Sequence, residues 1–333
     1  LLSSLGRGSH GKVKLAKGPN GALVALKIID RESRSGRRLG VTAAEEARRR
    51  KEKIRKEIAI LKKCAHPHVV GLQEVIDDPA SKKVYLVLEY MEGGELIWRS
   101  SAYKPAMERS EARRVLRHVT CGLEYLHRQG VIHRDVKPAN ILRTPAYPPY
   151  TYKLSDFGVS HLRSKIKDLR MDEEDKELAR TVGSPAFLAP ELCSTSEEVR
   201  DQPVNHMLDV WALGVTLYCL CYGQCPWWGR GEWQLFHSIT HDPLPIPDTE
   251  EDTELIHLLQ GMLNKNVHHR LSLQQVKSHP WTLRDLEDPE AWLRDTDVET
   301  CTMVKVNAAE VHGAVETLKD KVKGKLRRLS TSF

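Results

Sequence analysis

The run from His133 to Asn140 constrains the fold of this chain more than any other stretch. It reads His-Arg-Asp-Val-Lys-Pro-Ala-Asn and gathers a carboxylate, an amine and an amide within six positions. The apolar residues before it recur at helical spacing and predict a long supporting helix, namely Val115, Leu116, Val119, Leu123 and Leu126. The side chains of Asp135, Lys137 and Asn140 are therefore expected close together at the end of this helix.

The run fits the pattern H-R-D-L-x-x-x-N, with Val136 in place of leucine, and it resembles the catalytic loop of protein kinases. The resemblance implies that Asp135 orients the attacking hydroxyl, Asn140 binds Mg²⁺ and Lys137 neutralises the transferring phosphate. Lys137-Pro138 resembles the serine/threonine type rather than the tyrosine type. A solvated loop that matches the motif by chance is the alternative reading of this run alone.

A glycine-rich motif, G-x-G-x-x-G-x-V, lies near the start of the chain. Such glycines let backbone amides approach phosphate oxygens without a Cβ in the way. A dinucleotide-binding turn or a plain hairpin would share the pattern. Taken with the kinase resemblance, it predicts ATP contacts by Leu5, Gly6, Arg7, Gly8, Ser9, Gly11 and Val13.

Val24-Ala25-Leu26-Lys27 follows a predicted turn and resembles the kinase strand whose lysine holds the α- and β-phosphates. Lys27 is therefore predicted to bind ATP, with Ala25 beside it. Apolar residues at helical spacing surround Glu57, which the resemblance makes the ion-pair partner of Lys27. A solvated charge at the end of a strand is the alternative for Lys27.

The apolar run from Val84 to Met91 resembles the hinge between the two kinase lobes. The resemblance places Leu88 at the back of the adenine pocket and the backbone of Glu89 to Met91 against adenine, with Leu142 also in contact with the nucleotide. Core packing alone would also explain Leu88.

The sequence Asp156-Phe157-Gly158 resembles the kinase D-F-G step, so Asp156 is predicted to bind the Mg²⁺ that bridges the phosphates. The resemblance also pairs Glu191 with Arg270 and places Asp209 beneath the catalytic loop, both in structural roles. All motifs occur in the order that the family requires, and this order argues against chance.

Several runs are most similar to the calcium/calmodulin-dependent protein kinase kinases, above all residues 209–226. That family phosphorylates activation-loop threonines of other serine/threonine kinases. Two positions bear on mechanism: Arg180 occupies a slot that often holds an activating phosphothreonine, and Ala139 replaces an acidic residue that reads substrate arginine. Because arginine cannot be phosphorylated, we do not expect phosphorylation of this loop to be the on-switch. Ala139 favours recognition of another kinase's folded activation loop over selection of a basic peptide.

The composition indicates a globular chain: 333 residues, 40% hydrophobic, 29% charged, with a net charge of +6. This charge does not imply a nucleic-acid partner, and no membrane-spanning segment is predicted. Seven cysteines without a C-x-x-C pair indicate reduced thiols and an intracellular protein, in the cytoplasm or the nucleus. The chain starts without methionine, so we expect a fragment.

Two charged segments interrupt the motifs. Residues 31–53 are rich in arginine, and their alternatives are a solvated loop or a docking surface for an acidic partner. Residues 168–176 lengthen the activation segment. We favour a solvent-exposed loop there over a regulatory contact.

The last fifty residues resemble the family's regulatory tail. After an acidic, irregular stretch over 284–299 and a short extended piece over 301–306, Asn307 and Glu310 predict the start of a helix whose apolar face continues to Leu329. Residues 319–333 carry a net charge of +5, which is typical of a calmodulin target, a membrane-surface helix or a packed terminal helix. We expect residues 296–318 to cover the substrate cleft and calmodulin to capture 314–333.

Together these patterns predict an α+β, two-lobed protein kinase fold: a β-rich ATP-binding lobe over 1–91, a larger helical lobe over 92–283, and a C-terminal regulatory helix within 284–333. ATP and Mg²⁺ are the expected cofactors. The alternatives are an upstream kinase that ignores calmodulin and a catalytically silent kinase-fold scaffold, against which the intact Lys27, Glu57, Asp135, Asn140 and Asp156 argue.

Overall fold

The N-terminal lobe is built on one antiparallel sheet. A computed structural model describes residues 2–8, 11–18, 21–30, 55, 58–77, 83–155, 185–193 and 205–315. Its sheet has the order β1-β2-β3-β5-β4, with β1 Ser3–Gly8, β2 Gly11–Lys17, β3 Leu23–Asp30, β4 Leu72–Asp77 and β5 Lys83–Glu89. Residues 58–63 are helical and contribute buried Ile58 and Leu61 to the core. The predicted strands that carry the glycine motif and Lys27 are confirmed as β1, β2 and β3.

The C-terminal lobe is organised around two buried helices, α2 (Arg109–Arg128) and α7 (Met207–Tyr222). The predicted apolar face of α2 is confirmed, because Val115, Val119 and Leu123 have no exposed surface. Helix α7 is buried along nearly its whole length, which its continuous apolar sequence predicted. It ends at Gly223, whose φ is +72° and where a Cβ would lie 2.6 Å from the carbonyl carbon of Lys104.

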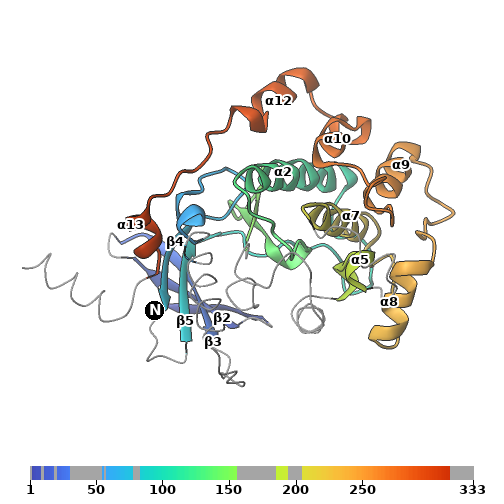
Figure 1. Ribbon diagram of the computed structural model, residues 1–333. Coiled ribbons are helices and arrows are strands. Elements are labelled where there is room, and N and C mark those ends of the chain that lie inside the picture. The colour runs from blue at the N-terminus through green and yellow to red at the C-terminus, as the bar shows by residue number, and fades with distance from the viewer. Residues whose placement is uncertain are drawn as a thin grey trace, which may run out of the picture.

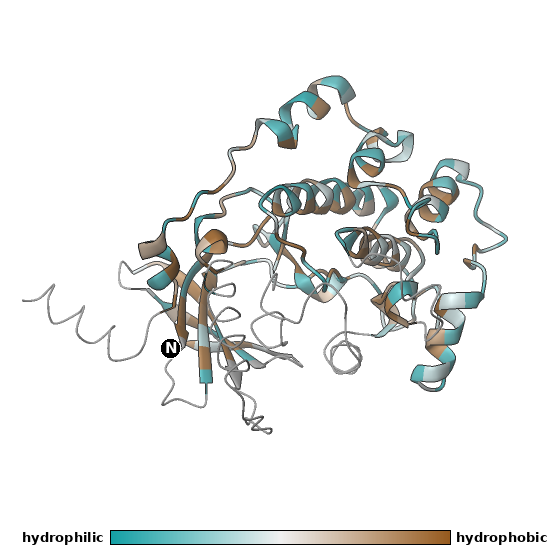
Figure 2. Cartoon of the chain, viewed as in Figure 1, coloured by the Kyte–Doolittle hydropathy of each residue, from teal (hydrophilic) through white to brown (hydrophobic). Residues whose placement is uncertain are grey.

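Shorter elements make up the rest of the described chain (Figure 1). They are η1 Pro138–Asn140, β6 Ile141–Thr144, β7 Thr151–Leu154, η2 Pro185–Phe187, α5 Pro190–Cys193, α8 Glu232–His241, α9 Thr253–Met262, α10 Leu273–Ser278, α11 Pro280–Leu283, α12 Pro289–Asp295, η3 Val298–Thr300 and α13 Ala308–His312. Brown, apolar ribbon is most continuous on the central strands and on the inward sides of α2 and α7 (Figure 2). No described helix is long and apolar enough to span a membrane.

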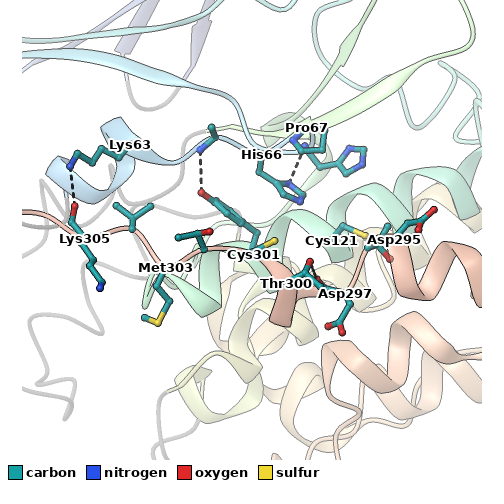
Figure 3. A pocket seen from close by; sticks show the side chains of 16 residues that line it. Lys63, His66, Pro67, Cys121, Asp295, Asp297, Thr300, Cys301, Met303 and Lys305 are labelled. Carbon is teal, nitrogen blue, oxygen red and sulfur yellow. Dashed lines mark hydrogen bonds between the residues drawn. The ribbon is translucent and has the colours of Figure 1, made fainter.

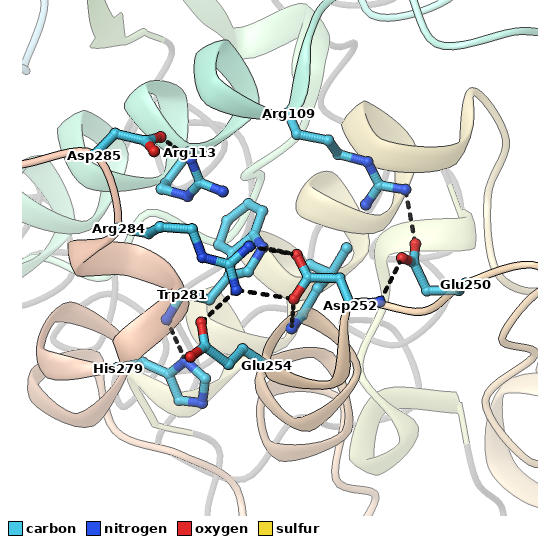
Figure 4. A network of polar contacts seen from close by, with 10 residues as sticks. Arg109, Arg113, Glu250, Asp252, Glu254, His279, Trp281, Arg284 and Asp285 are labelled. Carbon is cyan, nitrogen blue, oxygen red and sulfur yellow. Dashed lines mark hydrogen bonds and ion pairs between the residues drawn. The ribbon is translucent and has the colours of Figure 1, made fainter.

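A polar network closes the helical lobe just before the tail begins (Figure 4). Asp252 caps α9 and receives hydrogen bonds from the Trp281 indole at 3.0 Å and from the Arg284 guanidinium at 2.8 and 3.0 Å. Arg113, on α2, pairs with Asp285. The chain therefore leaves the lobe from a fixed point.

The tail differs from its sequence-based description in two places. The stretch over 284–299 is not irregular, because it contains α12 and η3; the signal was Asp288, which caps the helix, followed by Pro289 at its first position. The capping box of Asn307 and Glu310 is confirmed. The helix that follows does not continue without a break, since α13 ends at His312 and residues 313–315 form a turn. Residues 316–333 lie outside the described residues.

Candidate active site

A buried carboxylate holds the catalytic loop in place. Asp209, at the start of α7, has no exposed surface and accepts hydrogen bonds from the backbone N–H groups of His133 at 2.8 Å and Arg134 at 2.7 Å. The His127 imidazole contacts the same carboxylate at 2.7 Å. Burial raises the pKa of Asp209, but these hydrogen bonds outweigh it and leave the pKa below its usual value. The expected role of Asp209 beneath the loop is therefore supported by its contacts.

This anchoring fixes an unusual backbone turn just before the key carboxylate. Arg134 has a φ of +67°, a conformation that non-glycine residues rarely adopt and that tertiary contacts must hold. Two hydrogen bonds that successive backbone N–H groups donate to Asp209 supply such contacts. As a result Asp135 follows a turn whose direction is determined by α7.

Asp135, Lys137 and Asn140 converge. The Lys137 amine lies 2.8 Å from each carboxylate oxygen of Asp135. The Asn140 amide nitrogen donates to Asp135 Oδ2 and to the Asp135 carbonyl, both at 2.7 Å. Because the nitrogen of Asn140 is engaged in this way, its Oδ1 is the atom left to bind a cation. Carboxylate and amide oxygens suit Mg²⁺.

The neighbouring strand is tied to Asn140 directly. Ser155 donates to the Asn140 carbonyl from its backbone nitrogen at 2.9 Å and from its hydroxyl at 3.0 Å. His133, fully buried, reaches the Ser155 carbonyl at 3.0 Å. Ser155 immediately precedes Asp156 in the sequence, although Asp156 itself lies outside the described residues. The described side chains contain no cluster of three acidic, histidine or cysteine residues that could hold a metal.

The nucleotide side is formed by β1 to β3 and the hinge. In the β1–β2 hairpin Gly8 pairs with Gly11 and Gly6 with Val13, while Ser9 and the Arg7 side chain lie outside the described residues. Lys27 is 4% exposed and sits opposite Val13 on β2. Its predicted partner Glu57 is not among the described residues.

The hinge strand β5 is buried on the side expected for an adenine pocket. Leu88 is 8% exposed and pairs with Ala25, and Met91 is 5% exposed. Leu142, on β6, is partly buried and bridges Glu95 just beyond the hinge. Of the residues predicted to surround adenine, Leu88 and Glu89 thus lie on β5, Met91 follows this strand, and Leu142 on β6 is joined to the chain after the hinge by its bridge to Glu95.

The Glu89 side chain has a role that the sequence did not indicate. Its carboxylate accepts from the Gly71 backbone N–H at 3.1 Å and pairs with Lys153 at 2.6 Å. Lys153 belongs to β7, so this pair connects the hinge to the strand that leads to Asp156. No local pattern marks it, because the partners are 64 positions apart.

The predicted pair of Glu191 and Arg270 is present and buried. Two hydrogen bonds of 2.8 and 2.9 Å join the guanidinium to the carboxylate, with side chains 0% and 1% exposed. Arg270 also donates to the Met207 carbonyl at the start of α7. Removal of one partner from such a pair costs about 3–5 kcal/mol, so this contact fixes α5 against α7.

The tail does not lie where we expected. Residues 296–315 contact Lys277, Arg128, Gln129, Lys63 and Lys62. These residues belong to α10, the end of α2 and the helix over 58–63, and not to the loop of Asp135. The hypothesis that residues 296–318 cover the substrate cleft is therefore wrong for the described part of that segment. Helical spacing indicated a docked face but not the surface on which it docks.

Comparison with known proteins settles the family. Residues 1–282 match the model of the protein kinase domain. The chain belongs to the protein kinase family. Its motifs and relatives make it a serine/threonine kinase that uses ATP and Mg²⁺.

Three relatives illustrate the likeness. Serine/threonine-protein kinase ssp1 of Schizosaccharomyces pombe is 48% identical over 330 residues, which cover 98% of this chain and 48% of ssp1. SNF1-activating kinase 1 of Saccharomyces cerevisiae is 41% identical, over 86% of this chain and 28% of its own. The calcium/calmodulin-dependent protein kinase kinase of Caenorhabditis elegans is 34% identical over 96% of this chain and 58% of its own length. The kinase thus spans between about a quarter and three-fifths of these relatives' lengths.

Proposed function

We propose that this kinase phosphorylates the activation-loop threonine of other serine/threonine kinases. The observation that carries the proposal is the set of relatives, of which one is named an SNF1-activating kinase and one a calcium/calmodulin-dependent protein kinase kinase. The acceptor site adds support, since the exposed Ala139 offers no carboxylate that would read a basic peptide. A folded partner surface would then supply the recognition.

In this reaction Asp135 orients the acceptor hydroxyl and receives its proton, while Lys137 holds the carboxylate in position and offsets negative charge. Asn140, fixed by its two bonds to Asp135, would hold Mg²⁺ through Oδ1, and Lys27 would bind the nucleotide phosphates. ATP supplies the phosphoryl group and Mg²⁺ neutralises the charge that develops on it. Positioning and electrostatics account for most of the catalysis.

The direct test offers ATP·Mg²⁺ and two substrates to the kinase: a folded, catalytically inactive serine/threonine kinase and a short peptide with the same activation-loop sequence. We expect phosphate on the activation-loop threonine of the folded protein, at a rate well above that of the peptide. Equal rates, or phosphate spread over surface sites, would contradict recognition of a folded kinase.

We further propose that calcium-loaded calmodulin binds residues 314–333. The support is the basic, amphipathic sequence of this stretch and the name of one relative. Its alternative is an upstream kinase that ignores calmodulin. Titration of the whole chain with labelled calmodulin, with calcium and with a chelator, separates the two: calcium-dependent binding supports control, and no binding in calcium leaves the kinase activity without this switch.

A further inference from the structure

A segment of the tail crosses from the helical lobe to the sheet lobe. We call residues 299–315 the strap. In Figure 1 the red-orange chain runs from α12 past the end of α2 to α13, whose Glu310 pairs with Lys63 of the sheet lobe. The strap therefore contacts both lobes, on a surface that does not include the loop of Asp135.

Side chains of the helical lobe form hydrogen bonds with backbone atoms of the strap. Arg128 donates to the carbonyls of Glu299 and Cys301, each at 3.1 Å. Gln129, 6% exposed, donates to the Thr302 carbonyl at 3.3 Å and accepts from the Val304 N–H at 2.7 Å. One side-chain amide thus makes the same pair of bonds that a neighbouring strand would make, and it holds the strap in an extended conformation.

A lysine of the sheet lobe binds the next part of the strap. Lys63 donates to the Lys305 carbonyl at 2.9 Å and pairs with Glu310 at 2.6 Å. Glu310 also closes the capping box of α13 with Asn307, so the ion pair and the helix start support each other. Ala314, 2% exposed, anchors the end of the strap in the core.

Between the contacts with Gln129 and those with Lys63, the strap passes over a cavity. A cavity of about 750 Å³ lies under it, lined by the loop over 65–68 and by residues 295–305 (Figure 3). Beside this cavity the partly buried Cys301, Val304 and Val306 pack against the core. The polar contacts of Gln129 and Lys63 hold the backbone of the strap in its position. Changes to those contacts should release the strap without opening a core.

We infer that the strap positions the two lobes for phosphoryl transfer, with Gln129 and Lys63 as positioning residues. Lys27 belongs to one lobe, and Asp135 and Asn140 belong to the other. The strap ties Gln129, which follows α2 and lies four residues before His133, to the helical residues 58–63, which directly follow Glu57 in the sequence. Because misplacement of reacting groups by 1 Å can cost about 10²-fold in rate, a tie between these points affects the chemical step.

This inference goes beyond the proposed function, since it concerns transfer to any substrate. It also predicts the opposite effect on activity to that of an inhibitory tail, because release of the strap should lower the kinase activity. The test uses the full chain without calmodulin and a generic peptide substrate, so it does not depend on which kinase is the natural target.

The first variant is Gln129→Leu, which removes both hydrogen bonds to the strap and keeps a side chain of similar size. The second is Glu310→Lys, which replaces the ion pair with Lys63 by a repulsion between two positive charges at the surface. Lys63→Arg is the conservative rescue, since it keeps the charge and the donors. Lys104→Glu, at an exposed lysine away from the strap, is the matched control. Each variant is assayed for kcat and KM in single-turnover and steady-state transfer and for hydrogen exchange over 58–63 and 299–315.

We expect Gln129→Leu and Glu310→Lys to raise hydrogen exchange in both segments and to lower kcat by roughly tenfold, with the peptide KM nearly unchanged. Lys63→Arg and Lys104→Glu should retain the wild-type kcat. If exchange rises while kcat is unchanged or increases, the strap does not position the lobes. If exchange does not rise in either variant, these contacts do not hold the strap, which also overturns the inference. Should Gln129→Leu fail to fold, Glu310→Lys decides alone, because Glu310 is a surface residue.

Discussion

At the scale of single residues, Asp135 depends on its neighbours for its position. Lys137 and Asn140 hold both oxygens of its carboxylate, and Asp209 fixes the turn that precedes it. A carboxylate restrained on each side loses little further freedom when the substrate arrives. The residue is therefore prepared for its role before the acceptor binds.

Asp135→Asn should lower kcat by about 10²–10⁴-fold, because the amide cannot accept the hydroxyl proton while its shape is retained. The measurement is phosphate transfer from ATP·Mg²⁺ at saturating substrate. Nucleotide binding, followed as a thermal shift, should remain. A loss of less than about tenfold would remove Asp135 from the proton-transfer step.

At the scale of elements, α2 depends on close approach to the loop that follows the helix over 58–63. A Cβ on Gly122 would lie 2.7 Å from the His68 carbonyl oxygen and 3.3 Å from a Leu154 methyl. The first of these distances is too short for any side chain. Glycine is thus required here by packing rather than by backbone conformation.

Gly122→Ala should destabilise the kinase by about 1–3 kcal/mol, since the loop must shift away from α2. Urea unfolding measures this. Gly231→Ala is the control, because Gly231 is exposed and a Cβ there would meet no atom within 4 Å. Equal midpoints for the two variants would contradict the packing account.

The same contact region contains three histidines that stay neutral in the fold. The His68 and His118 rings stack at 4.1 Å, and His118 Nδ1 accepts from the Tyr152 N–H at 3.2 Å, a bond that requires an unprotonated nitrogen. Burial lowers the pKa of His118 to about 3 and the pKa of His66 to about 4, and it also lowers the pKa of His68.

Stability should therefore fall as the pH falls below about 6.5, the pKa of histidine in the unfolded chain, because the unfolded state then binds protons that the folded state does not. For His118 the loss at pH 5.5 is about 1 kcal/mol. His118→Asn keeps an acceptor and should reduce the difference in Tm between pH 7.5 and 5.5. The exposed His268→Asn serves as the control, and an undiminished pH dependence in His118→Asn would exclude His118 as its source.

At the scale of the whole molecule, a lobe built on a sheet and a lobe built on helices each contribute residues to the predicted nucleotide site. The sheet contributes Lys27, Ala25 and Leu88, and the helical lobe contributes the loop held by Asp209. The pair of Glu89 and Lys153, together with the strap, connects the lobes outside the catalytic loop. ATP bound between the lobes adds one more connection.

ATP·Mg²⁺ at about 100 times its Kd should therefore stabilise the wild-type kinase by about 2.7 kcal/mol. Lys27→Met should lose most of this gain, since its phosphate contact is removed. Lys12→Met, at an exposed lysine on β2, should keep it. The comparison is a thermal shift with and without nucleotide, and an equal shift in Lys27→Met would show that Lys27 does not bind the phosphates.

The sequence by itself determined that Asp135, Lys137 and Asn140 lie close together, because they fall within six positions of one loop. The family and the two-lobed fold were predicted through resemblance, from the order of several motifs along the chain. The pair of Glu191 and Arg270 and the place of Asp209 were also predictable, but only through resemblance. The predicted ion pair of Lys27 with Glu57 and the role of Asp156 stay predictions, since Glu57 and Asp156 lie outside the described residues.

The tertiary structure alone decided where the tail docks and how the lobes are joined. Helical spacing and a capping box located α13, yet they could not distinguish the substrate cleft from the surface formed by Lys63 and Gln129. Gln129 lies 175 positions from Val304 in the chain, and it binds backbone atoms that every residue carries. Contacts of this kind leave no mark in local sequence, so only the folded arrangement shows them.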